Sequence, residues 1–392
     1  MIIQPRIRGF ICTTAHPEGC ARNVREQVEY VRGRGAIEGL PKRVLVLGCS
    51  TGYGLASRIV TTFAGGARTI GVSFEKPPAE TKTASAGWYN NRAFEQEARS
   101  AGYDALTIEG DAFSDEVKRQ VVEAIRVEFG QIDLLIYSMA APARTHPRTG
   151  ELQRSAIKPL GEAVRLKTLN TDKAEVYEAE IQPATDEEAQ ATVAVMGGED
   201  WGMWIDALEV AGMLARDFRT FNYTYLGSEL TWPIYWQGTL GKAKEDVDRT
   251  AAALRERLGP DTARVVALKA AVTQASSAIP VVPLYGTVLF AVMKQMGLHE
   301  GCIEQIDRLF RTRFAWTSET DEAGRLRLDD WELSVPVQAE VLRRWPLLST
   351  ETLGSLADLE EYRTQFLRLF GFGLAGVDFH KDADPMSVPA LA

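Results

Sequence analysis

The sequence predicts an α/β protein whose centre is a doubly wound parallel sheet. Three observations within residues 43–142 lead to this fold class. Short apolar runs alternate with helix-period segments, a glycine-rich turn follows the first run, and acidic or small residues follow the next three. Strands that alternate with helices form parallel sheets with right-handed crossovers, and such sheets bind ligands at the carboxyl ends of their strands.

The first strand and its turn lie in RVLVLGCSTGYGLASRIVTTFA, residues 43–64. The continuous β-branched run suits a strand that is buried on both faces. Gly48, Gly52 and Gly54 then form GxxxGxG, which allows the backbone to approach a pyrophosphate at the N-terminus of the next helix. The motif lacks the GK[ST] of a Walker A loop, and taken alone it is also compatible with an ordinary strand-to-helix turn.

A second strand, ARTIGVSFEK, ends in Phe74 and Glu75. An acidic residue at this place accepts hydrogen bonds from both adenosine-ribose hydroxyls and repels a 2′-phosphate. The pattern therefore favours NADH over NADPH, although the neighbouring Lys76 weakens that preference.

Two more strands complete this half of the sheet. DALTIEGDAFS forms the third and ends in Asp111 and Ala112, where a carboxylate can meet the adenine amine. A clear amphipathic helix follows, and then a fourth strand, QIDLLIYSMAAP, which leaves Met139 and Ala140 at its carboxyl end. Because each strand end carries a residue type that suits a dinucleotide, the pattern favours a Rossmann-type cofactor site over an ordinary turn.

Residues 144–201 are predicted to be an insertion on the substrate side of the sheet. EAVRLKTLN and AEVYEAEIQPA alternate apolar and polar residues, which is typical of a solvated β-hairpin. TDEEAQATVAVMGG begins with a capping box, Thr185 to Glu188, and predicts a helix that ends at Gly197. We expect a lid or flap here rather than a second domain.

The sheet is predicted to resume at TFNYTYLG and at ARVVALKAAVTQASSAIP. An apolar helix over residues 284–297 and extra C-terminal helices follow. Because no repeat or low-complexity linker separates these parts, we expect a single extended Rossmann-type domain over residues 1–392.

Composition restricts the partners and the compartment. The chain holds 44 basic and 53 acidic residues, and its net charge of −9 argues against a nucleic-acid partner. With no apolar run of about 18 residues and no secretory signal, we expect a cytoplasmic protein without a membrane partner. Four cysteines without a CxxC pair fit a reducing compartment. We predict no metal site, because Pro17 and Gly19 interrupt the row of Cys12, His16 and Cys20.

A phenol and two ammonium groups lie close together in ELTWPIYWQGTLGKAKEDV. A phenol has a pKa of about 10 and donates protons poorly at neutral pH unless a cation stabilises its anion. On one continuous helix, Lys242 would share a face with Tyr235, and Lys244 would lie on the opposite face. Gly238 and Gly241 favour a helix that begins after the tyrosine, and geometry then leaves the choice of lysine open.

Nearly the whole chain resembles the FabV-type trans-2-enoyl thioester reductases, which use NADH to saturate enoyl-acyl carrier protein or enoyl-CoA in the last step of type II fatty acid elongation. The resemblance runs through IIQPRIRGFICTTAHPEGC, GCSTGYGLASR, GWYN, GDAFS, AAPARTHPRTG, AVMGGEDW, IYWQGTLGKAK, TQASSAIP, HEGCIEQ and LFGFGLAGVDF. It implies a monomer with an extended nucleotide-binding fold.

The resemblance also implies roles for individual residues. Its Tyr-x8-Lys pattern selects Tyr235 as the proton donor and Lys244 as its partner, while Tyr225 matches a substrate-contacting tyrosine that is available as a second donor. The implied NADH site comprises Gly48, Cys49, Ser50, Thr51, Gly52, Tyr53, Phe74, Glu75, Asp111, Ala112, Met139, Ala140, Lys244, Thr273, Gln274 and Ala275.

Two other functions are open at this point. A short-chain ketoreductase acting on a C=O group would carry Tyr-x3-Lys, but Thr239 occupies that position. A non-enzymatic NADH sensor would need neither Tyr235 nor Lys244. The patterns do not encode acyl chain length or the choice between acyl carrier protein and CoA.

Overall fold

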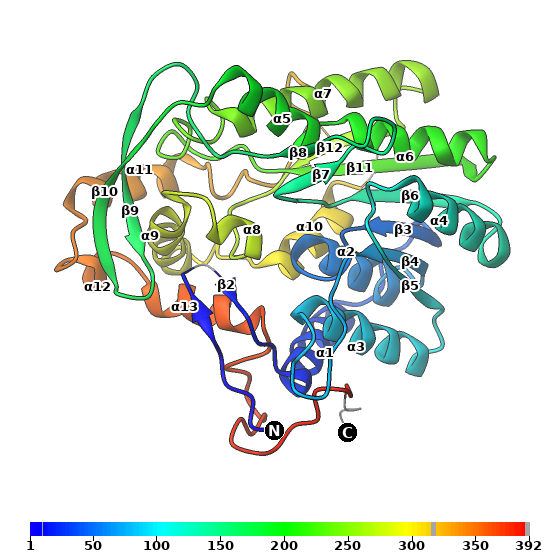
Figure 1. Ribbon diagram of the computed structural model, residues 1–392, viewed down its shortest axis with the longest axis horizontal. Coiled ribbons are helices and arrows are strands. Elements are labelled where there is room, and N and C mark those ends of the chain that lie inside the picture. The colour runs from blue at the N-terminus through cyan, green and yellow to red at the C-terminus, as the bar shows by residue number, and fades with distance from the viewer. Residues whose placement is uncertain (10, 315–318, 389–392) are drawn as a thin grey trace.

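The computed structural model describes residues 1–9, 11–314 and 319–388, and a seven-stranded sheet runs through its centre (Figure 1). The strand order is β13-β12-β11-β6-β3-β4-β5, and every neighbouring pair is parallel. The order reverses between β3 and β6, so the loops after these two strands open at the topological switch point. The predicted doubly wound fold is confirmed. The strands are β3 (Arg43–Leu47), β4 (Arg68–Ser73), β5 (Ala105–Glu109), β6 (Ile132–Tyr137), β11 (Leu214–Thr224), β12 (Ala263–Ala267) and β13 (Leu326–Arg327).

Helices cover both faces of the sheet. Successive side chains of β3 point to opposite faces of the sheet. Val44 and Val46 belong to the hydrophobic core on one face, and Leu45 and Leu47 belong to the core on the other. This burial on both faces explains why the strand lacks polar alternation. One face carries α1 (Pro17–Gly33), α2 (Gly52–Phe63), α3 (Ala86–Ser100) and α10 (Cys302–Thr312), and the other carries α4 (Asp115–Glu128), α6 (Glu199–Val210) and α7 (Thr239–Leu258).

The polar segment between β6 and α6 folds as two hairpins and a helix. The expected hairpin is present as an antiparallel pair, and the expected helix begins with the Thr185–Glu188 capping box. A smaller hairpin, which the sequence patterns do not predict, precedes them. The larger hairpin packs its apolar residues, Val164 among them, against Ile234 and Val281. The elements are β7 (Ala143–Thr145), β8 (Leu152–Arg154), β9 (Val164–Asn170), β10 (Glu175–Ile181) and α5 (Asp186–Met196).

A second body of structure surrounds α9 (Val282–Gln295), which lies close to the helix predicted over residues 284–297. Figure 1 shows the β9–β10 hairpin, α11 and α13 beside this helix. The Met1 ammonium donates to the Ala383 carbonyl at 2.8 Å, so the N-terminus contacts the segment that follows α13. None of the helices in the described ranges has the length and apolarity that crossing a bilayer requires. The remaining elements are β1 (Ile7–Arg8), β2 (Ile11–Cys12), α8 (Gln274–Ser277), α11 (Val335–Arg344), the 3-10 helix η1 (Trp345–Leu347), α12 (Leu353–Leu356) and α13 (Leu359–Arg368).

Candidate active site

The glycine turn joins β3 to α2 at the switch point of the sheet. Gly48 has φ +77°, and an added Cβ would overlap the Ser138 carbonyl at the end of β6. A Cβ on Gly54 would overlap the Gly48 carbonyl. The turn therefore needs glycine for its tightness. Thr51 precedes α2 and its side chain makes no capping hydrogen bond, so the first N–H groups of α2 are left for a ligand, as pyrophosphate binding at a helix N-terminus requires.

The side chains within this turn point in different directions. Cys49 is fully buried and its thiol donates to the Asn91 side chain at 3.5 Å, which makes it part of the support for the turn. Tyr53 instead donates its hydroxyl to the Lys269 carbonyl at 2.7 Å and thus ties the turn to the end of β12. Ser50 donates to Glu75 at 2.6 Å.

The predicted ribose-binding position is acidic. Glu75 follows β4, and its carboxylate lies against the first turn of α3, where a Cβ on Gly87 would overlap it. Glu109, at the end of β5, accepts from the Ser73 hydroxyl at 2.8 Å and from the Glu75 N–H at 3.3 Å, and burial raises its pKa. Two carboxylates at this edge oppose the binding of a 2′-phosphate. Phe74 extends into solvent beside them and is 80% exposed.

The predicted adenine position follows β5. The Asp111 carboxylate accepts from the Phe113 N–H at 2.9 Å. Lys118 donates to the Ala112 carbonyl at 3.1 Å and to Asp200 at 2.8 Å, and both charged side chains are buried. Sequence reasoning missed Lys118 and Asp200, because an isolated lysine on an amphipathic helix gives no signal of its buried partner.

Two further predicted segments reach the glycine turn. Met139, half-buried after β6, lies 3.3 Å from where a Gly48 Cβ would be, and the exposed Ala140 follows it. Thr273 caps α8 and lies 3.5 Å from the Cβ position of Gly52. Gln274 and Ala275 begin α8 and are exposed. The structure thus brings the ends of β3, β6 and β12 together around one turn.

The two predicted tyrosines form an edge-to-face pair. Tyr225 directly follows β11, and its ring lies 5.1 Å from that of Tyr235, centroid to centroid, at 76°. Tyr235 is buried and Tyr225 is half-buried, and desolvation raises the pKa of each phenol. The Tyr235 carbonyl accepts from the N–H groups of Gly238 and Gly241, and α7 begins at Thr239. The helical register between Tyr235 and the lysines is therefore broken, as the two glycines predict.

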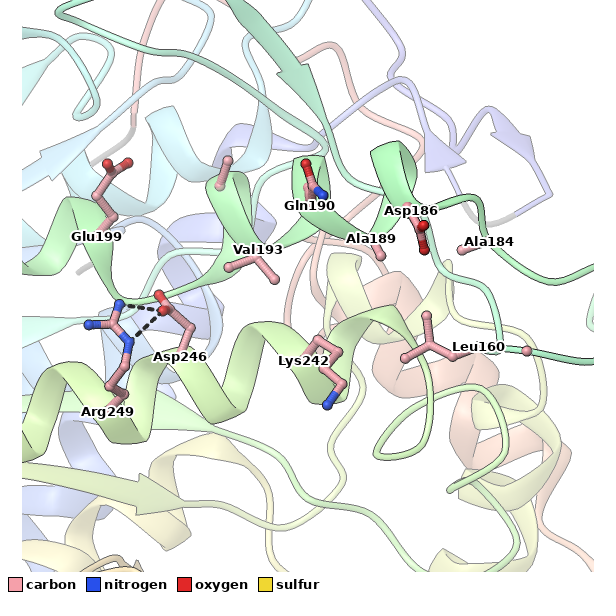
Figure 2. A pocket seen from close by; sticks show the side chains of 12 residues that line it. Leu160, Ala184, Asp186, Ala189, Gln190, Val193, Glu199, Lys242, Asp246 and Arg249 are labelled. Atoms are coloured by element: carbon pink, nitrogen blue, oxygen red, sulfur yellow. Dashed lines mark hydrogen bonds and ion pairs between the residues drawn. The ribbon is translucent and has the colours of Figure 1, made fainter.

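The two lysines lie in different environments on α7. Lys244 is only 8% exposed, and within the described ranges no carboxylate lies within ion-pair distance of its ammonium. Burial lowers its pKa to about 8, and Asp248 opposes that shift. Lys242 is exposed and pairs with Glu245 at 2.9 Å. It lines a cavity of about 700 Å³ between α5 and α7, which Figure 2 shows from close by. Lys244 is thus the buried cation, and Lys242 is the solvated one.

Family models account for most of the chain. A model described as the trans-2-enoyl-CoA reductase catalytic region matches residues 82–314, and one described as the NAD(P)H binding domain of trans-2-enoyl-CoA reductase matches residues 2–80. This chain belongs to the trans-2-enoyl-CoA reductase family. The predicted family, oxidoreductase class and nicotinamide cofactor are thereby confirmed.

Relatives of this reductase match it over its full length. It is 55% identical over 396 residues to an enoyl-acyl-carrier-protein reductase (NADH) of Burkholderia thailandensis, which covers 100% of both chains. It is 53% identical over 388 residues to the same named protein of Edwardsiella ictaluri, with 98% of both chains covered. The Treponema denticola trans-2-enoyl-CoA reductase, solved with NAD, superposes with a TM-score of 0.95 at 46% identity over 98% of both chains. The Clostridium acetobutulicum trans-2-enoyl-CoA reductase, solved with NADH, superposes with a TM-score of 0.95 at 39% identity over 98% of both chains.

A third family model, described as an enoyl reductase FAD binding domain, matches residues 320–383. The side chains of this segment do not fit a flavin. Val337, Val341 and Phe366 are buried in the core around α9. Gly371, at φ +77°, serves close packing, because an added Cβ would meet the backbone of His16 and Cys20 at the start of α1. We therefore derive no step through a flavin in this reductase.

Proposed function

We propose that this protein reduces the trans-2 double bond of enoyl thioesters with NADH, and that Tyr235 and Lys244 carry the proton chemistry. The observation that supports this proposal most strongly is the edge-to-face pair of Tyr225 and Tyr235, together with a buried lysine in the helix after Tyr235 that has no ion-pair partner among the described residues. A desolvated ammonium is unfavourable unless a ligand group shares its charge. Ribose hydroxyls and a tyrosinate-like oxygen are such groups.

The chemistry assigns a separate task to each of these residues. Bound NADH supplies a hydride to the β-carbon of the enoyl thioester, and negative charge then develops on the thioester carbonyl oxygen. Tyr235 would hydrogen-bond that oxygen, and its proton would reach the α-carbon through the enol, which completes the saturated thioester. Because burial raises the pKa of Tyr235, the phenol needs a neighbouring cation to lose its proton easily, and Lys244 supplies that cation while it holds the nicotinamide ribose.

The cofactor would lie along the carboxyl edge of the sheet. We assign the pyrophosphate to the turn from Gly48 to Tyr53, the adenosine ribose to Glu75, and the adenine to Asp111. Phe74, Ala112, Met139, Ala140 and the Thr273–Ala275 segment border the same path. The acidic ribose position supports a preference for NADH over NADPH.

We further propose that the chain acts in the cytoplasm as a monomer and a single domain, on enoyl groups carried by acyl carrier protein or CoA. Residues 144–201 would lie on the substrate side. The packing of the β9–β10 hairpin against Ile234, the neighbour of Tyr235, supports that placement. Light scattering after size exclusion tests the monomer.

Purified protein mixed with crotonyl-CoA and NADH tests the function through loss of NADH absorbance. We expect turnover that depends on the double bond. A matched assay with acetoacetyl-CoA separates a ketoreductase from an enoyl reductase, because that substrate offers a ketone and no double bond. Turnover of acetoacetyl-CoA without turnover of crotonyl-CoA would contradict the proposal.

A further inference from the structure

Glu332 is a buried carboxylate that touches the tyrosine pair from a distant part of the chain. It lies between β13 and α11 and has no exposed surface. Its Oε1 accepts from the hydroxyl of Tyr225 at 3.0 Å and from the hydroxyl of Tyr285 at 2.8 Å. Its Oε2 accepts from the Ala270 N–H at 2.6 Å. The proposed function above leaves this residue without a role.

The contacts of Gln338 fix the direction of these hydrogen bonds. Its Nε2 lies 2.7 Å from the Glu332 backbone carbonyl, which can only accept, so this end of the amide is the nitrogen. The same nitrogen lies 3.0 Å from the Tyr285 hydroxyl, whose oxygen therefore accepts from it. The proton of Tyr285 is then directed at Glu332. Both carboxylate oxygens thus receive protons from other groups, as an ionised carboxylate does.

The hydrogen bonds around Glu332 are those of an ionised carboxylate. Burial, the largest influence, raises its pKa, and the Ala270 N–H, the Lys269 ammonium and the two phenols act against that shift. Lys269 is itself buried, which lowers its pKa, and Glu332 opposes that shift; its ammonium donates to the Ala270 carbonyl at 2.7 Å. With Glu332 ionised, the one proton of the Tyr225 hydroxyl must point at Oε1, because an ionised carboxylate has no proton to give.

We propose that Glu332 is a positioning residue for the reduction, because it takes the hydroxyl proton of Tyr225 and leaves Tyr235 as the phenol of the pair that donates to the substrate. The inference rests on the enoyl thioester reduction proposed above. Tyr225 then faces the substrate with its ring and with a hydrogen-bond acceptor oxygen. It is not the second proton donor that its place beside the substrate would suggest.

The same carboxylate also ties the tyrosine pair to the cofactor turn. The Lys269 N–H donates to the Gln305 side chain at 2.9 Å, and the Lys269 carbonyl accepts from Tyr53 in the glycine turn. Ala270, the next residue, donates to Glu332. The single peptide group between Lys269 and Ala270 therefore connects the turn that would hold the pyrophosphate with the carboxylate that holds Tyr225.

Replacing Glu332 by glutamine tests the direction of the Tyr225 proton at almost constant shape. If the amide keeps its oxygen on the Ala270 N–H, its nitrogen faces the two phenols and reverses the hydrogen bond to Tyr225. We expect Glu332→Gln to lower kcat with crotonyl-CoA at least tenfold and to leave KM for NADH within about twofold, because the loss of one oriented buried hydrogen bond is of this size. A kcat within threefold of wild type would overturn the proposal.

A double-mutant cycle separates this role from general support of the fold. In a Tyr225→Phe background, Glu332→Gln should lower kcat by no more than about a further threefold, because no hydroxyl proton is left to direct. Equal fold-losses in both backgrounds would show that Glu332 does not act through Tyr225. If Glu332→Gln does not fold, Glu332→Asp takes its place in the cycle, since the shorter side chain withdraws the carboxylate from Tyr225.

Tyr285→Phe is the matched control. It removes a hydrogen bond of similar length to the same oxygen from a phenol, but it leaves the Tyr225 hydroxyl in place. We expect a thermal midpoint close to that of Glu332→Gln and a much smaller loss of kcat; an equal loss of kcat would contradict the proposal. An inactive wild-type protein would instead disprove the proposed function, and the two failures are thus distinct.

Discussion

The two ends of the candidate active site are held in place in different ways. At the cofactor end, most of the contributing residues lie in the loops that follow strands of the parallel sheet, and backbone geometry such as the left-handed Gly48 sets their position. At the tyrosine end, Tyr225 and Tyr235 depend on side chains from distant segments, and Glu332 is 107 residues from Tyr225. The sheet and its backbone therefore hold the cofactor end in place. The tyrosine end keeps its geometry only while its buried network of polar groups is complete.

This difference predicts how each end responds to substitution. A change at the cofactor end should alter binding of the dinucleotide and leave the chemistry intact. A change at the tyrosine end should alter kcat and leave NADH binding intact. The following experiments test that division, beginning with the largest expected effect.

Tyr235→Phe should lower kcat by about 10²- to 10⁴-fold with NADH binding nearly unchanged, because the substitution removes the general acid and preserves the ring that packs on Tyr225. Steady-state kinetics with crotonyl-CoA and a fluorescence titration of NADH measure the two quantities. Turnover at the wild-type rate in this variant would exclude Tyr235 from the mechanism.

Lys244→Met should impair both catalysis and NADH binding, because we assign Lys244 both to the Tyr235 phenol and to the nicotinamide ribose. We expect about a hundredfold or greater loss of kcat/KM together with weaker NADH binding. Lys242→Met is the matched control on the same helix, and because Lys242 is solvated we expect little change. If Lys242→Met lost most of its kcat/KM and Lys244→Met kept it, Lys242 rather than Lys244 would be the partner of Tyr235.

Glu75→Ser should act at the cofactor end alone. The wild-type protein should prefer NADH, since bringing a 2′-phosphate to Glu75 costs on the order of several kcal/mol. The substitution should raise kcat/KM for NADPH by roughly tenfold to a hundredfold and change kcat with NADH little. Equal kcat/KM for NADH and NADPH in the wild type would show that Glu75 does not lie at the ribose.

The pH dependence gives the smallest effect and tests the charge of Lys244. Its pKa is lowered by burial to about 8, so the ammonium is present below pH 8 and is lost as the pH rises through that value. We expect kcat/KM for NADH to fall by up to about tenfold per pH unit above pH 8. The contribution of Lys244 to the free energy of unfolding rises over the same window, because the unfolded chain binds the proton more tightly than the folded one up to pH 10.5. Unchanged kcat/KM from pH 7 to pH 9.5 would contradict a charged Lys244.

Sequence patterns locate the loops after the strands at the cofactor end, but they do not reveal the tertiary contacts at the tyrosine end. Gly48, Glu75 and Asp111 could be located because a strand and its following loop are adjacent in the chain. The break before α7 was predictable for the same reason, since Gly238 and Gly241 act locally. The family resemblance, rather than spacing, selected Lys244.

The residues that sequence reasoning missed share one property. Lys118, Lys269 and Glu332 are charged side chains whose burial depends on contacts with remote segments. In the sequence each resembles an ordinary surface charge, and only tertiary packing reveals its partners. Buried polar networks of this kind carry no periodic signal.

The distance along the chain between Tyr225 and Glu332 also sets an order of events during synthesis. Residues 43–137 supply four adjacent strands, which can pair while the ribosome is still adding the remainder. At about 5 to 20 residues per second, Glu332 is added roughly 5 to 20 s after Tyr225. A nascent chain therefore completes its dinucleotide-binding edge before its tyrosine pair is anchored, and a polypeptide released before residue 332 would lack the carboxylate that holds Tyr225.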